Sequence, residues 1–310
     1  MELLTPSNWK DYELIDCGDR EKLERFGNYL LRRPEPQAVW SRSLSESDWE
    51  TQASAQFIRK RGSSSSDSQE KGEWIMRKGM PERWFISYSY KDLILKFRLG
   101  LTAFGHIGIF PEQACNWEYI YDKVRERPQP LSPSLKQEGG KREGYPILNL
   151  FAYTGGSSLA ARAAGADTFH VDSVKNVISW GKEIMETNGL ADIHWVTEDA
   201  IKFVRREVTR GKKYRGIILD PPAYGRGPDG EKWVLEEQIN EMTGLCRKLL
   251  EPAGSFFILN MYSMGLSALV AESLVRSHFK EVSLMESGEF YFADKFGKRL
   301  PLGTFLRFTT

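Results

Sequence analysis

Residues 146–164 read Pro146-Ile147-Leu148-Asn149-Leu150-Phe151-Ala152-Tyr153-Thr154-Gly155-Gly156-Ser157-Ser158-Leu159-Ala160-Ala161-Arg162-Ala163-Ala164. The stretch opens with a short apolar run, as a buried parallel strand does. Two adjacent glycines follow in a tight turn, and the end is rich in strong helix formers. A strand, a glycine turn and a helix in succession present backbone N–H groups to a ligand at the carboxyl end of the strand. A buried strand that ends in a Gly-Gly turn without a ligand fits the same pattern.

Strand and helix patterns alternate from this stretch onward, which predicts a doubly wound, Rossmann-like α/β sheet. The final 35 residues break the alternation, because two strands follow each other there without a crossover helix, and we expect an antiparallel pair. Seven strands result. The expected strands are 147–151, 168–171, 193–196, 216–219, 255–259, 281–285 and 304–308, and the expected helices are 157–164, 174–187, 199–209 and 235–250.

The first third of the chain predicts a smaller, β-rich domain, because its apolar segments are short and rich in aromatic and branched residues. We place this domain at 1–127, with a possible role in substrate recognition, and the cofactor-binding domain at 128–310, because residues 127–133 form a proline-rich linker. A serine-rich stretch at about 62–72 predicts a mobile loop. The expected elements are strands at 11–16, 22–26, 28–31, 74–76, 84–88 and 93–99, and a helix at 116–124.

Composition indicates an ordinary globular protein. The 310 residues carry a net charge of +1, which gives no strong field for a polyanion and excludes none. The three cysteines lie far apart, so we expect no disulfide framework and no metal site, and a reducing compartment. No apolar run is long enough to span a membrane, and the first residues do not resemble a signal peptide. We therefore expect a cytoplasmic protein.

Acidic residues follow three successive predicted strands. Asp172 lies where a carboxylate can accept hydrogen bonds from ribose hydroxyls, and Asp199 where one can accept from an adenine amino group. Either could instead cap the helix that follows it. Asp220 precedes Pro221 and Pro222, which stiffen the turn and remove N–H donors. That turn leaves carbonyl groups free to face a site, and it brings the Tyr224 ring close enough to stack on a base. Together the three carboxylates fit adenosine binding.

These motifs, in this order, resemble class I S-adenosylmethionine (SAM)-dependent methyltransferases from about residue 105 to the end. More narrowly they resemble the bacterial 23S ribosomal RNA (cytosine-C5 / guanine-N7) large-subunit methyltransferases, in a branch that lacks the PUA-type RNA module and the catalytic cysteine. Residues 108–113 are similar to a family segment that borders the cofactor. The resemblance implies SAM as cofactor and the following cofactor-binding residues: Phe110, Gln113, Asn149, Phe151, Ala152, Tyr153, Thr154, Gly155, Gly156, Ser157, Asp172, Ser173, Asp199, Ala200 and Asp220.

One departure from that family bears on the chemistry. Cytosine-C5 enzymes attack the ring with a cysteine thiolate, and Ser263 stands at the matching position here. A hydroxyl is a far poorer nucleophile than a thiolate near neutral pH. We therefore favour a nitrogen acceptor, whose lone pair needs no covalent intermediate. Asp220, Pro221, Pro222 and Tyr224 are the predicted catalytic residues.

The resemblance implies RNA, and ribosomal RNA in particular, as the partner. Two basic clusters are candidate phosphate contacts. One lies within 205–215 and the other is Arg59, Lys60 and Arg61. Either cluster could equally be a solvated surface. Three alternatives remain at this point: methylation of a small molecule or protein, a catalytically silent SAM-binding module, and a nicotinamide oxidoreductase. The intact segment 220–224 argues against the second, and the absence of a Gly-x-Gly-x-x-Gly spacing at 151–158 argues against the third.

Overall fold

The computed structural model describes residues 1–6, 9–59, 71–126, 144–262, 265–280 and 282–310. Two compact units emerge. The first comprises Met1–Leu4, Gln113–Phe290 and Gly303–Thr310, and the second comprises Thr5–Glu112 and Tyr291–Leu302. The domain boundary expected between residues 127 and 128, the Lys60-Arg61 pair and nearly all of the serine-rich stretch lie outside the described residues.

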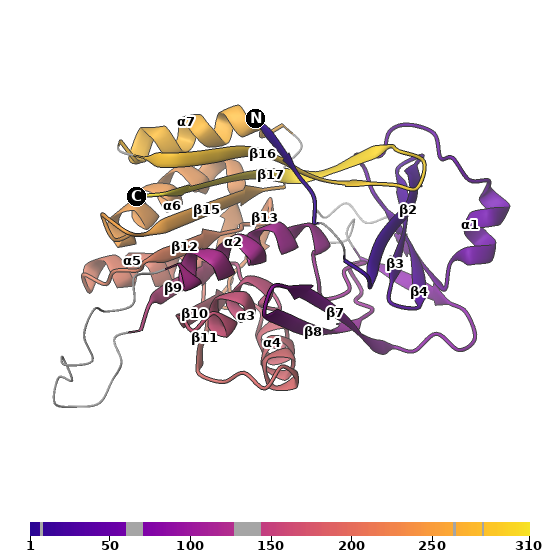
Figure 1. Cartoon of the computed structure of the whole chain (residues 1–310), viewed down its shortest axis with the longest axis horizontal. Coiled ribbons are helices and arrows are strands. Elements are labelled where there is room, and N and C mark those ends of the chain that lie inside the picture. The colour runs from indigo at the N-terminus through magenta and orange to yellow at the C-terminus, as the bar shows by residue number, and fades with distance from the viewer. Residues whose placement is uncertain (7–8, 60–70, 127–143, 263–264, 281) are drawn as a thin grey trace. The chain divides into compact units, whose positions relative to one another are not determined.

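The first unit is built on an eight-stranded sheet in the order β1-β16-β17-β15-β12-β9-β10-β11 (Figure 1). Strands β9, β10, β11, β12 and β15 run parallel to their neighbours in this group, whereas β17 is antiparallel to β15. The strands are β1 (Glu2–Leu4), β9 (Pro146–Leu150), β10 (Asp167–Asp172), β11 (Ile193–Thr197), β12 (Gly216–Leu219), β15 (Phe256–Met261), β16 (Ser283–Ala293) and β17 (Arg299–Thr309).

Strand order reverses at β9, so the crossover helices fall on opposite faces of the sheet. Helices α2 and α3 pack together, while α5, α6 and α7 pack in sequence over a shared apolar core with β12 and β15. The helices are α2 (Ala114–Arg125), α3 (Gly156–Ala163), α4 (Lys175–Thr187), α5 (Ala200–Thr209), α6 (Leu235–Leu249) and α7 (Ala268–His278). A small hairpin, β13 (Tyr224–Arg226) with β14 (Lys232–Val234), lies between β12 and α6.

The second unit is rich in β-structure. A five-stranded sheet has the order β2-β3-β4-β5-β6, and β7 pairs with β8 in a separate two-stranded ribbon. The short helix α1 begins after Ser45, whose hydroxyl accepts from the Asp48 N–H in a capping box. The elements are β2 (Tyr12–Gly18), β3 (Glu21–Phe26), β4 (Tyr29–Pro34), α1 (Glu46–Gln52), β5 (Ala55–Arg59), β6 (Gly72–Met76), β7 (Arg83–Tyr90), β8 (Leu93–Gly100) and the 3-10 turn η2 (Pro111–Gln113) that leads into α2.

The predicted fold class is confirmed: a doubly wound α/β sheet with an antiparallel C-terminal pair, preceded by a β-rich part. The structure adds β1 as an eighth strand, parallel to β16. It also contains α1, β5, α7 and the β13–β14 hairpin, none of which the sequence patterns predicted.

Candidate active site

The chain leaves β9 through a turn of unusual backbone geometry. Phe151 and Tyr153 have φ values of 56° and 50°, and Gly155 has a φ of 91°. Such values are uncommon for residues with a side chain, so surrounding contacts must hold the turn. The Ala152 N–H donates to the Val171 carbonyl at 3.0 Å, and the Tyr153 N–H donates to Asp172 Oδ2 at 2.9 Å. The end of β10 therefore fixes the turn that follows β9.

The two glycines of the turn have different functions. Gly155 precedes α3 in the left-handed region, where glycine carries little strain. A Cβ added at Gly156 would lie 2.6 Å from the indole of Trp117, which is buried in α2. Gly156 thus lets α3 pack closely against α2. Ser157 stands in the first turn of α3, and Thr154 is buried beside the turn.

Asn149 is engaged inside the protein. Its Nδ2 donates to Ser158 Oγ at 2.9 Å, and that oxygen lies 3.0 Å from His170 Nδ1. All three side chains are buried, and burial lowers the pKa of His170 to about 3. A neutral histidine therefore joins β9, α3 and β10 beneath the turn.

Sheet register brings the predicted strand-end residues to one edge. Leu150 pairs with Val171 and with Leu219, and Leu219 pairs with Leu259. The residues that follow these positions are Phe151, Asp172, Asp220 and Asn260. Neighbouring strands lie about 4.8 Å apart. These four residues therefore form a row along the carboxyl edge of the sheet.

Asp172 accepts backbone hydrogen bonds on both carboxylate oxygens. Oδ2 accepts from Tyr153, and Oδ1 accepts from the Val174 N–H at 2.8 Å. Burial raises the pKa of Asp172, and the backbone N–H groups of Val174, Tyr153 and Ser173 offset part of that rise. Each oxygen has two lone pairs, so each keeps one acceptor position. That capacity matches the two hydroxyls of a ribose.

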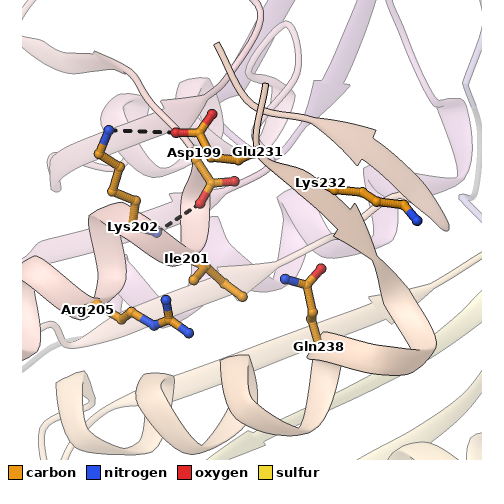
Figure 2. Close-up of a pocket in the computed structure, with 7 residues that line it drawn as sticks. All are labelled: Asp199, Ile201, Lys202, Arg205, Glu231, Lys232 and Gln238. Carbon is orange, nitrogen blue, oxygen red and sulfur yellow. Dashed lines mark hydrogen bonds and ion pairs between the residues drawn. The ribbon is translucent and has the colours of Figure 1, made fainter. Parts of the chain in front are cut away.

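Asp199 is the N-cap of α5, and its Oδ1 accepts from the Lys202 N–H at 2.9 Å. It also lines a cavity of about 340 Å³ (Figure 2). Lys202 is held there by ion pairs with Asp229 and Glu231, at 3.1 and 3.6 Å. The other lining residues are Ile201, Arg205, Lys232 and Gln238. Asp199 thus caps its helix and also lines the cavity, and its contact with an adenine amino group stays a prediction. Ala200, the next residue, is the buried first residue of α5.

The turn after β12 is anchored by the hairpin that follows it. Trp233 Nε1 donates to the Pro222 carbonyl at 2.7 Å, and the Leu235 N–H donates to the Ala223 carbonyl at 3.0 Å. The Pro222 and Ala223 carbonyls thus accept hydrogen bonds within the protein. Of the three carbonyls of Pro221, Pro222 and Ala223, only that of Pro221 still fits the prediction that this turn leaves carbonyl groups free to face a site. Within the described residues, no backbone or side-chain hydrogen bond ends on the Pro221 carbonyl. The Trp233 ring also packs on Phe151, with 4.7 Å between ring centroids.

Tyr224 opens β13 and is 37% exposed. The Lys232 ammonium lies 6.0 Å from the centre of its ring. Lys232 is the direct cross-strand partner of Arg226, so two cations meet at the outer end of the hairpin. Ser173 Oγ donates to the Arg226 carbonyl at 3.1 Å, which ties the hairpin to the end of β10. The hairpin therefore adds an exposed ring and two cations next to the Asp220 turn, and its loop carries the carboxylates of Asp229 and Glu231.

A buried amide network, which the sequence did not predict as a unit, connects α2 to the end of β15. Asn116 Nδ2 donates to Gln113 Oε1 at 2.9 Å and to Asn260 Oδ1 at 3.0 Å. Gln113 Nε2 also reaches the Tyr262 hydroxyl at 3.4 Å. Asn260 stands in the otherwise apolar strand β15, and a polar residue there was the signal that could have identified it. Ser263 lies outside the described residues.

Phe110 belongs to the second unit, where its ring meets that of His106 at 5.4 Å. Half of the basic residues in the predicted cluster at 205–215 are in ion pairs. Arg205 pairs with Glu241 at 2.6 Å, Arg206 with Glu198, and Arg210 with Glu207 at 3.1 Å. The ion pairs favour the solvated-surface interpretation for these three arginines.

None of the three cysteines, Cys17, Cys115 and Cys246, forms a disulfide, and all three are buried. Among the residues with described positions, no group of three or more His, Cys, Asp or Glu side chains could hold a metal ion. No helix in the described part of the chain is long and apolar enough to cross a membrane.

Comparison with known proteins gives a full-length structural match. A SAM-dependent methyltransferase from Agrobacterium tumefaciens is 34% identical, with a TM-score of 0.85, and the match covers 100% of this chain and 93% of that one. SMU.776, crystallised with SAH, has a TM-score of 0.67 at 15% identity, covering 98% of this chain and 76% of that chain, which is a likeness of fold. No protein-family model matches.

Among curated relatives, the ribosomal RNA large subunit methyltransferase K/L of Shewanella frigidimarina is 29% identical over 181 residues, 56% of this chain and 23% of that protein. The protein of the same name from Shewanella baltica is 26% identical over 197 residues, 61% of this chain and 25% of its own length. The chain therefore spans about a quarter of the length of these relatives.

The reversal of strand order at β9, the antiparallel β17 and the row of polar residues at the sheet edge define a class I methyltransferase fold. The chain belongs to the SAM-dependent methyltransferases. It is an enzyme, and its cofactor is SAM.

Proposed function

We propose that the enzyme methylates a nitrogen atom of an RNA base, in ribosomal RNA, by one direct in-line transfer. The curated relatives are named as ribosomal RNA methyltransferases, which supports RNA as the acceptor. The observation that carries the proposal is the stiff Asp220 turn, beside an exposed aromatic ring and two cations. We also propose a cytoplasmic location, where ribosomal RNA is available, and a substrate-recognition role for the β-rich N-terminal region.

The residues at the carboxyl edge of the sheet fit SAM. Asp172 would accept from the ribose hydroxyls and Asp199 from the adenine amino group, since each carboxylate keeps acceptor capacity. Around the turn after β9, the predicted residues Asn149, Phe151, Ala152, Tyr153, Thr154, Gly155, Gly156 and Ser157 supply the turn and its flanks. When bound, SAM presents an electrophilic methyl group on a sulfonium. The task of the protein is then to align the acceptor nitrogen and to exclude water.

Asp220 and the Pro221 carbonyl would hold the acceptor. Both are hydrogen-bond acceptors, so they select a group that carries N–H bonds and orient its lone pair. Tyr224 would stack on the base, because its ring is partly exposed at the start of the hairpin. Pro222 would shape the turn through its carbonyl bond to Trp233.

The cysteines support a nitrogen rather than a carbon acceptor. A C5 methyltransferase needs a thiolate, and every thiol in this chain is buried. Burial raises the pKa of Cys17 to about 12 and holds the pKa of Cys246 well above its usual range. A raised pKa keeps these two thiols protonated near neutral pH, which makes them poor nucleophiles.

The test is single-turnover methyl transfer from labelled SAM to large-subunit RNA, followed by mass spectrometry of the nucleosides. We expect Asp220→Ala to bind SAM with near-normal affinity and to lose at least about 100-fold in rate, because its contact matters in the transition state. Asp229→Ala is the matched control: it removes an exposed carboxylate from the hairpin that follows the Asp220 turn, and its rate should stay near that of the wild type. Near-normal turnover by Asp220→Ala would place the acceptor elsewhere.

A further inference from the structure

The β7–β8 ribbon has one buried and one exposed face. Burial alternates strictly along β7, and nearly so along β8. Trp84, Ile86, Tyr88, Leu95 and Phe97 point into the core of the second unit. A strand with one buried face normally carries polar residues on the other. The exposed face of this ribbon departs from that expectation.

Two large apolar side chains lie on the exposed face. Phe85 is 48% exposed and Ile94 is 71% exposed. The Lys96 ammonium lies 4.7 Å from the centre of the Phe85 ring, and Arg98 is the direct cross-strand partner of Phe85. Phe85 is therefore a half-exposed aromatic ring with one cation near its face and a second cation at the cross-strand position.

The charged side chains at the outward positions of the two strands are all cations. The outward positions are Arg83, Phe85, Ser87, Ser89, Ile94, Lys96 and Arg98, and these include three cations and no carboxylate. Ser87 is the cross-strand partner of Lys96, and Ser89 that of Ile94. The outward β7 residues that follow Phe85 therefore have small side chains. Asp11 lies at the edge of the ribbon, where its Oδ2 accepts the Ser87 N–H at 2.7 Å.

We propose that this face, called here the ribbon face, docks a single-stranded segment of the RNA substrate, an inference that rests on the proposed function. Phe85 stacks on an unpaired base, since every base offers a π-face. Lys96 and Arg83 contact the neighbouring phosphates, which complement their charge. A duplex hides its base faces, so the ribbon face prefers unpaired strands.

The experiment measures binding of a fluorescent, unstructured 20-nucleotide RNA, and of its duplex, over a range of salt concentrations. We expect Phe85→Ala to weaken single-strand binding roughly 5- to 100-fold and to affect the duplex less. Lys96→Gln should reduce the slope of log affinity against log salt by about 0.7. Phe296→Ala and Lys295→Gln are matched controls from the β16–β17 turn in the same unit, where Phe296 is 50% exposed. Both should bind like the wild type.

Unchanged SAM affinity and melting temperature will show that each variant is folded. Single-strand affinity within twofold of wild type for the double variant Phe85→Ala/Lys96→Gln would overturn the ribbon-face proposal. An equal loss in Phe296→Ala, or preferential binding of a protein substrate that Phe85→Ala abolishes, would also overturn it. Methyl transfer is scored separately. If RNA binding depends on Phe85 but no RNA is methylated, the proposed function fails and the ribbon face stands. If the double variant methylates RNA with unchanged kcat/KM, the ribbon-face proposal fails and the proposed function stands.

Discussion

Removal of the Asp172 carboxylate should abolish tight SAM binding while leaving the fold intact. Both oxygens already accept one backbone N–H, at 2.9 and 2.8 Å, which leaves one acceptor position on each for a ribose hydroxyl. Hydrogen bonds to a charged group contribute about 1.5–3 kcal/mol each. Loss of two such bonds costs about 3–6 kcal/mol, so Asp172→Ala should raise the Kd for SAM roughly 150- to 25,000-fold.

Stability should change much less than affinity. The substitution removes the acceptors of the Tyr153 and Val174 N–H groups, but it also removes a costly ionisation. Because burial raises the pKa of Asp172 above its unfolded value, ionisation destabilises the fold once the pH exceeds the unfolded pKa. The two effects oppose each other, and we expect a net change within about 1 kcal/mol. In the wild type, SAM affinity should fall as the pH drops through the raised pKa, because the ionised carboxylate is the acceptor.

Titration calorimetry of SAM against both proteins tests this, with urea denaturation as the check on folding. Asp167→Ala is the control, because Asp167 begins the strand that Asp172 ends and pairs with His194 at 2.8 Å at the opposite edge of the sheet. It should bind SAM normally. A Kd within threefold of wild type for Asp172→Ala, or an equal loss in Asp167→Ala, would refute the assignment of the ribose site.

Three further predictions concern chemistry and stability. With 5-fluorocytosine RNA we expect no covalent adduct, and Ser263→Ala should keep much of the activity; a trapped adduct that this variant abolishes would show a covalent C5 mechanism. Asp16→Ala should lower the free energy of unfolding in urea by about 3–5 kcal/mol, because the buried carboxylate accepts from Trp49, from Lys298 at 2.7 Å and from backbone N–H groups. Burial opposes these hydrogen bonds but does not outweigh them, so the pKa of Asp16 is lowered. Its contribution to stability is therefore lost only as the pH falls below about 3.8. Burial lowers the pKa of His170 to about 3, so the folded protein keeps this side chain neutral while the unfolded chain takes up a proton below about pH 6.5. The free energy of unfolding should therefore fall by up to about 1.4 kcal/mol per pH unit between pH 6.5 and 4. A fall as steep in His170→Gln as in the wild type would contradict this.

Local patterns predicted the parallel part of the sheet well. Apolar runs of four or five residues, separated by amphipathic segments, identify β9, β10, β11, β12 and β15 without tertiary information. The same periodicity placed Asp172 and Asp220 at strand ends, because parallel strands end at one edge of a sheet. The resemblance to a known family then named the cofactor.

Features that depend on distant contacts were missed. Strand β1 has three residues and pairs with Gly288–Phe290, so nothing local marks it as a strand. The β13–β14 hairpin consists of two three-residue strands that follow a proline pair, a pattern that predicts a loop. Helix α7 was overlooked even though Ala268–His278 is rich in helix formers.

Side-chain partners in the site were the least predictable. In the sequence, the glycines at 155 and 156 look like one motif. In the structure, the indole of Trp117, 39 positions earlier in the chain, leaves no room for a side chain at Gly156. The link between Gln113 and Asn260 joins residues 147 positions apart. Such contacts arise only when α2 packs on the sheet, and no spacing in the chain encodes them.

The most direct test of the central claim is mass spectrometry of ribosomal RNA nucleosides from a strain that lacks this protein, compared with the same strain carrying wild type or Asp220→Ala. The account predicts that one base-N-methylated nucleoside of the large-subunit RNA disappears in the deletion strain. It should return with the wild type and stay absent with Asp220→Ala. An unchanged set of methylated nucleosides, or the loss of a C5-methylated cytosine instead, would contradict it.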